Sequence, residues 1–135
     1  MSESVFKEDI FEGKKVFITG GATGMGLGFA QAFLNHGAEV FIASRKEENL
    51  AKAAFETEKK FGKKLTWKTM DVRDNVTVEE VAEFLKSEWG ELDILVNNAA
   101  GNFVAPVAAM SENAWRAVVD IVLDGTFRVS KACYP

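Results

Sequence analysis

A short apolar run that ends in a cluster of glycines constrains this chain more than any other feature. Lys15–Thr19 is apolar enough for a buried strand, and a helical pattern begins a few residues later, at Gly24. Glycines allow the backbone to turn tightly between the strand and the helix. The first N–H groups of a helix lack intrahelical partners and lie at the positive end of the helix dipole. The stretch therefore predicts a strand, a loop that binds a phosphate group through its backbone, and a helix. The residues expected to face that phosphate are Gly20, Ala22, Thr23, Gly24, Met25 and Gly26.

The spacing of these glycines separates the loop from two common nucleotide motifs. The fingerprint G-x-G-x-x-G/A needs a small residue where Phe29 stands, and the P-loop needs a Gly-Lys-Ser/Thr that is absent here. The pattern T-G-x-x-x-G-x-G does fit, as Thr19, Gly20, Gly24 and Gly26. It resembles the nucleotide-binding signature of the short-chain dehydrogenases/reductases. The alternative is a glycine-rich turn that binds no ligand.

Composition narrows the class of protein. A length of 135 residues with 47% hydrophobic side chains suits the core of one domain, and a net charge of −4 gives no general attraction to nucleic acid or to anionic membranes. With one cysteine, Cys133, and one histidine, His36, neither a disulfide framework nor a protein metal site is expected. The absence of a long apolar run predicts no membrane insertion. We expect a cytoplasmic protein, or a peroxisomal one if a targeting signal lies beyond Pro135.

Strand and helix patterns alternate along the chain. Strands are predicted over 15–19, 39–43, 65–70 and 92–96, with helices between them that stop at Gly37, Gly62 and Gly90. The third helix starts either at Asp74 or at a Thr77-x-x-Glu80 capping box. Alternation with short connections predicts an α/β fold with a doubly wound parallel sheet of the Rossmann type.

The last predicted helix follows Ser111 as its cap and continues without interruption to the end of the chain. Its apolar stripe is expected on one side, formed by Trp115, Val118, Val119, Val122, Thr126, Val129 and Cys133. Because this pattern is still running at Pro135, we interpret 13–135 as the nucleotide-binding half of a single domain, truncated after this helix, with 1–12 as an amino-terminal tail.

Residues just after each strand are the first candidates for ligand contacts, because ligands bind at the carboxyl ends of such strands. After the second strand stands Arg45, where an NAD-binding protein usually places an acidic residue for the ribose. A guanidinium suits a 2′-phosphate, so Arg45 favours NADPH/NADP over NAD; the alternative is a solvated arginine. After the fourth strand, Asn97 is expected to bond across the sheet, while Ala99, Ala100 and Gly101 leave room for the cofactor.

Several segments are similar to the 2,4-dienoyl-CoA reductases within that superfamily. Residues 97–103, Asn-Asn-Ala-Ala-Gly-Asn-Phe, differ from the common Asn-Asn-Ala-Gly pattern by one extra alanine and a following Asn-Phe, and this variant resembles the subgroup. The segments 42–46, 71–74 and 120–126 resemble it too. The resemblance implies NADPH-dependent reduction of a 2,4-dienoyl-CoA to a 3-enoyl-CoA in the β-oxidation of unsaturated fatty acids. It also implies a homotetramer when the protein is full length, with the last helix as a candidate interface.

The resemblance also implies roles for individual residues. Asn102 becomes a catalytic hydrogen-bond donor to the thioester carbonyl, which gains negative charge when hydride adds to the conjugated chain. Val122 stands where many short-chain reductases have an asparagine that anchors a relay water. The remaining implied contacts are Asp71, Val72 and Asn98 with the cofactor, and Arg73, Phe103 and Ser111 with the acyl-CoA substrate.

Two alternatives remain open at this stage. One is a 2-enoyl-CoA or 3-oxoacyl thioester reductase of the same superfamily. The other is a non-catalytic nucleotide-binding module, because the family's Tyr-x-x-x-Lys segment has no counterpart here and Tyr134 is followed only by Pro135. For the same reason, residues 1–135 alone are expected to lack turnover.

Overall fold

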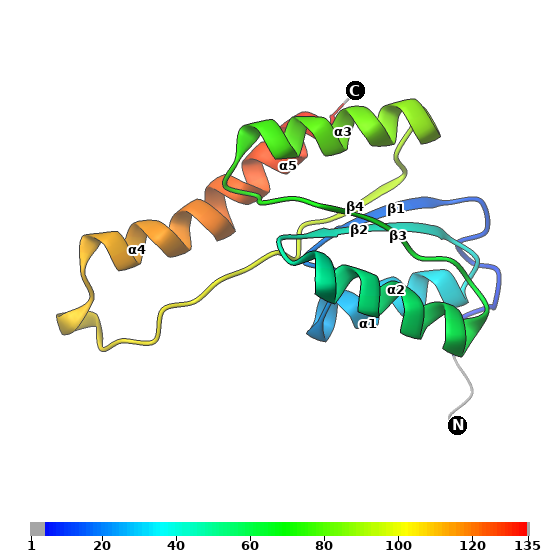
Figure 1. The fold of residues 1–135 in the computed structure, drawn as a ribbon, viewed down its shortest axis with the longest axis horizontal. Helices are drawn as coiled ribbons and strands as arrows, with labels where there is room; N and C mark the ends of the chain where they lie inside the picture. The colour runs from blue at the N-terminus through cyan, green and yellow to red at the C-terminus, as the bar shows by residue number, and fades with distance from the viewer. Residues whose placement is uncertain (1–4, 135) are drawn as a thin grey trace.

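The computed structural model describes residues 5–134, so residues 1–4 of the predicted tail and Pro135 lie outside the described part. Four parallel strands form one sheet in the order β3-β2-β1-β4, with helices on both faces (Figure 1). The predicted doubly wound α/β fold is confirmed. The division between tail and domain after residue 12 stays a prediction. The elements that build the sheet and cover it are β1 (Lys15–Thr19), α1 (Gly24–Asn35), β2 (Glu39–Ser44), α2 (Glu47–Phe61), β3 (Thr66–Thr69), α3 (Asn75–Trp89) and β4 (Ile94–Val96).

Alternation along the two central strands divides the core into two layers. Val16 and Ile18 of β1 pack with Leu34 on the side of α1 and α2, whereas Phe17 turns to the opposite side. There Phe17 meets its register partner Phe41 on β2, with ring centroids 5.5 Å apart. Because successive side chains on a strand point to opposite faces, these strands bury apolar residues on both sides, which requires helices on both faces.

Helix α3 begins, and helices α2 and α3 end, at residues that the sequence indicates. Asp74 caps α3 by accepting a hydrogen bond of 2.9 Å from the Val76 N–H, so the start at Asp74 is confirmed over the capping box. Gly62 and Gly90 follow the last residues of α2 and α3 with positive φ angles of 66° and 74°. Glycine occupies such angles at little steric expense, which explains why both helices stop there.

The last helical segment departs from the expected uninterrupted helix. It consists of α4 (Glu112–Val119), a π-helical turn over Asp120–Asp124, and α5 (Gly125–Cys133). A π-turn winds more residues into one turn than an α-helix, so it changes the direction in which later side chains point. The stripe from Trp115 to Cys133 is therefore not on one side: Trp115 is 62% exposed, whereas Val129 is fully buried against the sheet. That part of the prediction is wrong.

Helix α4 lies beyond the carboxyl edge of the sheet, at the left of Figure 1, while α5 returns beside α3. The chain reaches α4 through 97–110, which holds one short 3-10 turn at Val107–Ala109. Ser111 accepts a hydrogen bond of 3.2 Å from the Ala114 N–H, which confirms it as the cap of α4. No helix within residues 5–134 combines the length and the apolar character needed to cross a membrane.

Candidate functional site: a cavity at the carboxyl edge of the sheet

The glycine loop after β1 is shaped for a group that approaches the backbone. Gly20 and Gly24 have φ angles of +66° and +55°, in the region that favours glycine. A Cβ at Gly26 would collide with the Gly20 carbonyl, so only glycine fits there. Thr23 precedes α1 without a side-chain capping bond, and the first turn holds no acidic residue. The N–H groups at this helix start are therefore available to an anion.

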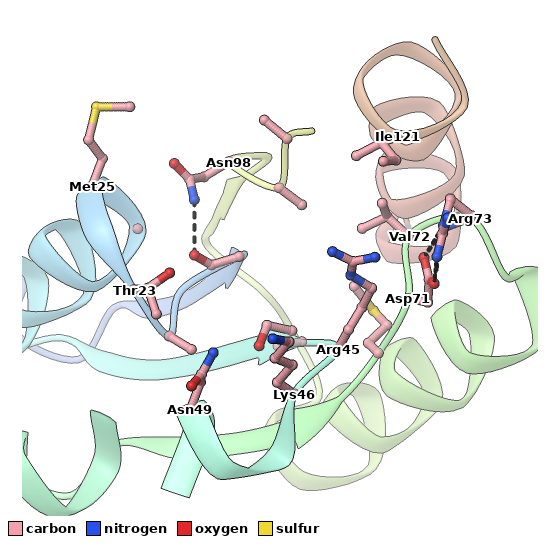
Figure 2. Close-up of a pocket in the computed structure, with 18 residues that line it drawn as sticks. Thr23, Met25, Arg45, Lys46, Asn49, Asp71, Val72, Arg73, Asn98 and Ile121 are labelled. Atoms are coloured by element: carbon pink, nitrogen blue, oxygen red, sulfur yellow. Dashed lines mark hydrogen bonds and ion pairs between the residues drawn. The ribbon is translucent and has the colours of Figure 1, made fainter. Parts of the chain in front are cut away.

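Hydrogen bonds fix this loop to the segment after β4. The Thr19 hydroxyl oxygen accepts bonds from the N–H groups of Asn98 and Ala99, at 3.0 and 2.9 Å. In return, Asn98 Nδ2 donates to the carbonyls of Thr19 and Gly20, each at 3.1 Å. Figure 2 shows this amide beside the glycine loop. The two strand ends are thus held together before any ligand arrives.

The residue that bridges the strands is therefore Asn98, and the prediction of Asn97 for this role is wrong. Asn97 Nδ2 donates instead to the Ser130 hydroxyl on α5, at 3.0 Å. Successive residues of a strand point to opposite faces of the sheet, and just after β4 the Asn97 side chain lies on the face that α5 covers, whereas the Asn98 amide reaches the end of β1.

A cavity of about 380 Å³ opens at this edge of the sheet, between the glycine loop, the end of β2 and the segment after β3. Most residues predicted for the cofactor line it, whereas Gly24 and Gly101 are not in its wall. Gly101 instead packs against the wall residue Ile121, whose Cδ1 would lie 2.7 Å from a Cβ at this position. The lining residues that were predicted for the cofactor are Gly20, Ala22, Thr23, Met25, Gly26, Arg45, Asp71, Val72, Asn98, Ala99 and Ala100.

Sequence reasoning missed several residues of the wall. Lys46 and Asn49 lie beside Arg45 at the start of α2, and all three side chains border the cavity in Figure 2. Their position just after β2 was a usable signal, since that strand end already pointed to Arg45. Ile121 comes from the π-turn, and no sequence pattern indicated it. Ala43, Ser44, Met70 and Arg73, which was predicted for the substrate, complete the wall.

A bidentate ion pair forms the corner of the cavity after β3. Arg73 Nη2 lies 2.6 Å from Asp71 Oδ2, and Arg73 Nε donates to both carboxylate oxygens, at 3.0 and 3.1 Å. The hydrogen bonds from Arg73 hold the pKa of Asp71 below its ordinary value, and the positive charge of Arg45 acts in the same direction. Asp71 is therefore an oriented carboxylate in the cavity wall, with much of its accepting capacity already used by Arg73.

The residues predicted for the substrate lie farther along the same edge. Asn102 and Phe103 are exposed on the segment between β4 and α4, outside the wall of the cavity, and Ser111 caps α4. Arg73 lines both this cavity and a second one of about 750 Å³ beside α4. The roles of these residues toward a substrate stay predictions. Within residues 5–134, no group of three or more His, Cys, Asp or Glu side chains is arranged to hold a metal ion.

The family model described as "short chain dehydrogenase" matches residues 14–135. The chain belongs to this family. Among solved structures, a short-chain dehydrogenase from Bacillus anthracis is 44% identical with a TM-score of 0.81, over 88% of this chain and 49% of that one. The L-sorbose reductase from Gluconobacter frateurii, solved with NADPH and L-sorbose, is 28% identical with a TM-score of 0.85, over 94% and 48%.

A curated relative confirms the resemblance to the 2,4-dienoyl-CoA reductases as well. The peroxisomal 2,4-dienoyl-CoA reductase of Rattus norvegicus, a (3E)-enoyl-CoA-producing enzyme, is 40% identical over 130 residues. That match covers 96% of this chain and 44% of the rat protein, so the chain spans less than half the length of this relative.

Proposed function

We propose that this chain is the cofactor-binding part of an oxidoreductase that reduces a 2,4-dienoyl-CoA to a 3-enoyl-CoA, in the breakdown of unsaturated fatty acids. Hydride from NADPH adds to the conjugated chain, and the resulting dienolate takes up a proton from solvent at carbon. The observation that carries the proposal is the cavity formed by the glycine loop, the free start of α1 and Arg45. It offers backbone N–H groups for a pyrophosphate and a guanidinium for a further phosphate. Membership in the short-chain dehydrogenase family supports a nicotinamide cofactor.

The choice of NADPH over NADH rests on the basic side chains after β2. Arg45 and Lys46 both line the cavity, and they directly follow Ser44 at the end of β2, where an NAD-binding protein places an acidic side chain for a ribose hydroxyl. Their positive charges favour a 2′-phosphate at this end of the cavity. The Gluconobacter reductase that was solved with NADPH has a similar fold, which supports a nicotinamide cofactor at this edge of the sheet.

Affinity for the two cofactors tests this choice. Arg45→Ala is expected to weaken NADPH binding about 10- to 100-fold while leaving NADH binding nearly unchanged, because a charge-assisted hydrogen bond contributes about 1.5–3 kcal/mol. Titration of the fluorescence of each reduced cofactor measures both dissociation constants. Lys52→Ala on the exposed face of α2 is the matched control. Retention of the NADPH preference in Arg45→Ala would refute the assignment of Arg45.

The substrate proposal rests on the resemblance around Asn102 and on the name of the rat relative. Asn102 would donate a hydrogen bond to the thioester oxygen, and Phe103 and Ser111 would line the acyl site, with Arg73 near phosphates of the CoA. An amide donor placed there stabilises the dienolate formed by hydride addition more than it stabilises the substrate.

Consumption of NADPH by the natural full-length protein tests the substrate. We expect turnover with a 2,4-dienoyl-CoA, and a fall in kcat of about 10²-fold or more in Asn102→Ala. Faster turnover with a 2-enoyl-CoA or a 3-oxoacyl thioester would favour those reductase activities instead. Cofactor binding without turnover on any of the three would indicate a nucleotide-binding module.

Assembly and location extend the same proposal. Leu123 and Phe127 are about two-thirds exposed on the outer side of the π-turn and α5, and burial of this apolar surface supports a homo-oligomer, proposed as a tetramer. We propose a cytoplasmic location, with the peroxisome as the alternative that the name of the rat relative supports.

A further inference from the structure

The π-turn between α4 and α5 is held by side chains of α5. In a π-turn the N–H of residue i+5 takes the place of that of residue i+4, and here the Gly125 N–H donates to the Asp120 carbonyl. Arg128 Nη1 donates to the carbonyl of Asp120 at 3.2 Å and lies 2.7 Å from Asp120 Oδ1. The Thr126 hydroxyl donates to the Val122 carbonyl at 2.6 Å. The turn therefore has a specific set of donors that stabilise it.

Arg128 also reaches out of its own helix. The same Nη1 donates to the carbonyl of Val72, on the segment after β3, at 3.4 Å. One guanidinium thus joins two backbone segments that are distant in the sequence. Close packing supports the connection, because a Cβ at Gly125 would lie only 2.8 Å from Val72 Cγ2. The segment after β3 and the π-turn are therefore in direct contact with no space between them.

The two segments joined by Arg128 each place a residue in the wall of the cofactor cavity. Val72 and Ile121 both line it, and Figure 2 shows their side chains next to each other where the π-turn approaches Asp71. Arg128 itself is outside that wall. A displacement of either segment would move this apolar part of the wall, while the glycine loop and Arg45 would stay in place.

We propose that Arg128 is a positioning residue of the cofactor site. By binding the carbonyls of Asp120 and Val72 together, it sets the location of Ile121 and Val72 against the bound dinucleotide. This inference rests on the proposed function, because it assigns the cavity to a dinucleotide. Since Arg128 acts on an apolar wall rather than on the 2′-phosphate, it serves NADPH and NADH equally.

The test compares Arg128→Met and Arg128→Lys with the unaltered protein. Arg128→Met removes all three interactions, and we expect the dissociation constants of NADPH and NADH to rise by the same factor, about tenfold. Arg128→Lys keeps a positive charge near Asp120, but its ammonium is not the planar guanidinium whose Nη1 donates to both carbonyls, so we expect an intermediate rise. Lys131→Met, which changes an exposed lysine one turn along α5, is the matched control and should leave both constants unchanged.

Hydrogen exchange gives a second readout that does not depend on the cofactor. Arg128→Met should exchange faster in 71–74 and 120–124, while β1 and β2 keep the protection of the unaltered protein. Unchanged dissociation constants in a folded Arg128→Met overturn the inference, and so does faster exchange spread over the whole sheet. If Arg128→Met does not fold, the constants of Arg128→Lys decide in the same way. Failure of the unaltered protein to bind either cofactor overturns the proposed function itself, and this inference with it.

Discussion

At the scale of single residues, the contact between Gly26 and Gly20 is the tightest constraint in the cavity. A Cβ at Gly26 would collide with the Gly20 carbonyl and approach Asn98 Nδ2, so Gly26→Ala must displace the glycine loop. We expect NADPH binding to be lost and the free energy of unfolding to fall by about 1–3 kcal/mol, as for other overpacked sites.

Gly28 provides the matched control for that substitution. It lies two residues further along α1, and a Cβ there meets nothing within 4 Å. Gly28→Ala should raise the free energy of unfolding by about 0.8–1 kcal/mol, because alanine is the better helix former. Urea denaturation measures both variants, and a Gly26→Ala protein as stable as Gly28→Ala would contradict the packing argument.

The Asp71–Arg73 pair should make the free energy of unfolding depend on pH in the acid range. The pKa of Asp71 is lowered in the folded protein by the hydrogen bonds from Arg73, so the pair contributes stability that is fully present above the unfolded pKa near 3.8. That contribution is lost as the pH falls below this value and through the lowered folded pKa. The difference in unfolding free energy between the unaltered protein and Asp71→Asn should therefore be constant above about pH 5 and shrink below pH 4. Denaturation series at pH 3 to 7 check this; a difference that grows toward low pH would contradict it.

Individual side chains show how far sequence reasoning reaches in the site. The glycine loop and Arg45 follow from local spacing and from the rule that ligands meet strand ends, and both do line the cavity. The prediction that Asn97 bridges the strands was wrong, and Asn98 has this role. The choice depends on which face of the sheet each side chain takes after β4, and a shift of one residue along the strand reverses it. Ile121 entered the wall through a π-turn, and no periodicity marks such a turn.

At the scale of elements, the start of α3 shows which of two possible helix caps the chain uses. Two caps were possible from the sequence, and Asp74 is the one used, whereas the Thr77 hydroxyl bonds to the carbonyls of Asp71 and Asp74. Asp74→Ala should lower the free energy of unfolding by about 1 kcal/mol. Glu80→Ala, which would break the rejected capping box, should change it by less than about 0.5 kcal/mol. Thermal or urea denaturation distinguishes the two, and the reverse order would refute the assigned cap.

Most element boundaries were predictable because each has a local chemical cause. Gly62 and Gly90 end their helices through positive φ angles, and Ser111 starts α4 through a side-chain bond. The π-turn at Asp120–Asp124 has no such local cause. Thr126 and Arg128 add side-chain donors to its Val122 and Asp120 carbonyls, and Arg128 also donates to the carbonyl of the distant Val72. A feature stabilised across the tertiary structure is invisible to a reading of local patterns.

At the scale of the whole molecule, helices cover both faces of the sheet, whereas nothing within residues 5–134 covers the outer side of the π-turn and α5. Phe127 is 65% exposed on α5, beyond the layer that packs on the sheet. We expect the protein to self-associate through this surface, and Phe127→Glu to shift it toward monomers at micromolar concentration. Sedimentation velocity measures the change. Phe55→Glu, which alters an equally exposed phenylalanine on α2 across the sheet, should leave the association unchanged.

The bonds that Thr19 and Asn98 exchange have a consequence for how a ligand enters. Since these bonds within the chain already join the two strand ends, little backbone freedom remains to be lost when a nucleotide binds. Binding of the nucleotide should therefore follow a single exponential, with an observed rate constant that rises linearly with nucleotide concentration. A slow rearrangement of the glycine loop would instead make that rate constant reach a plateau.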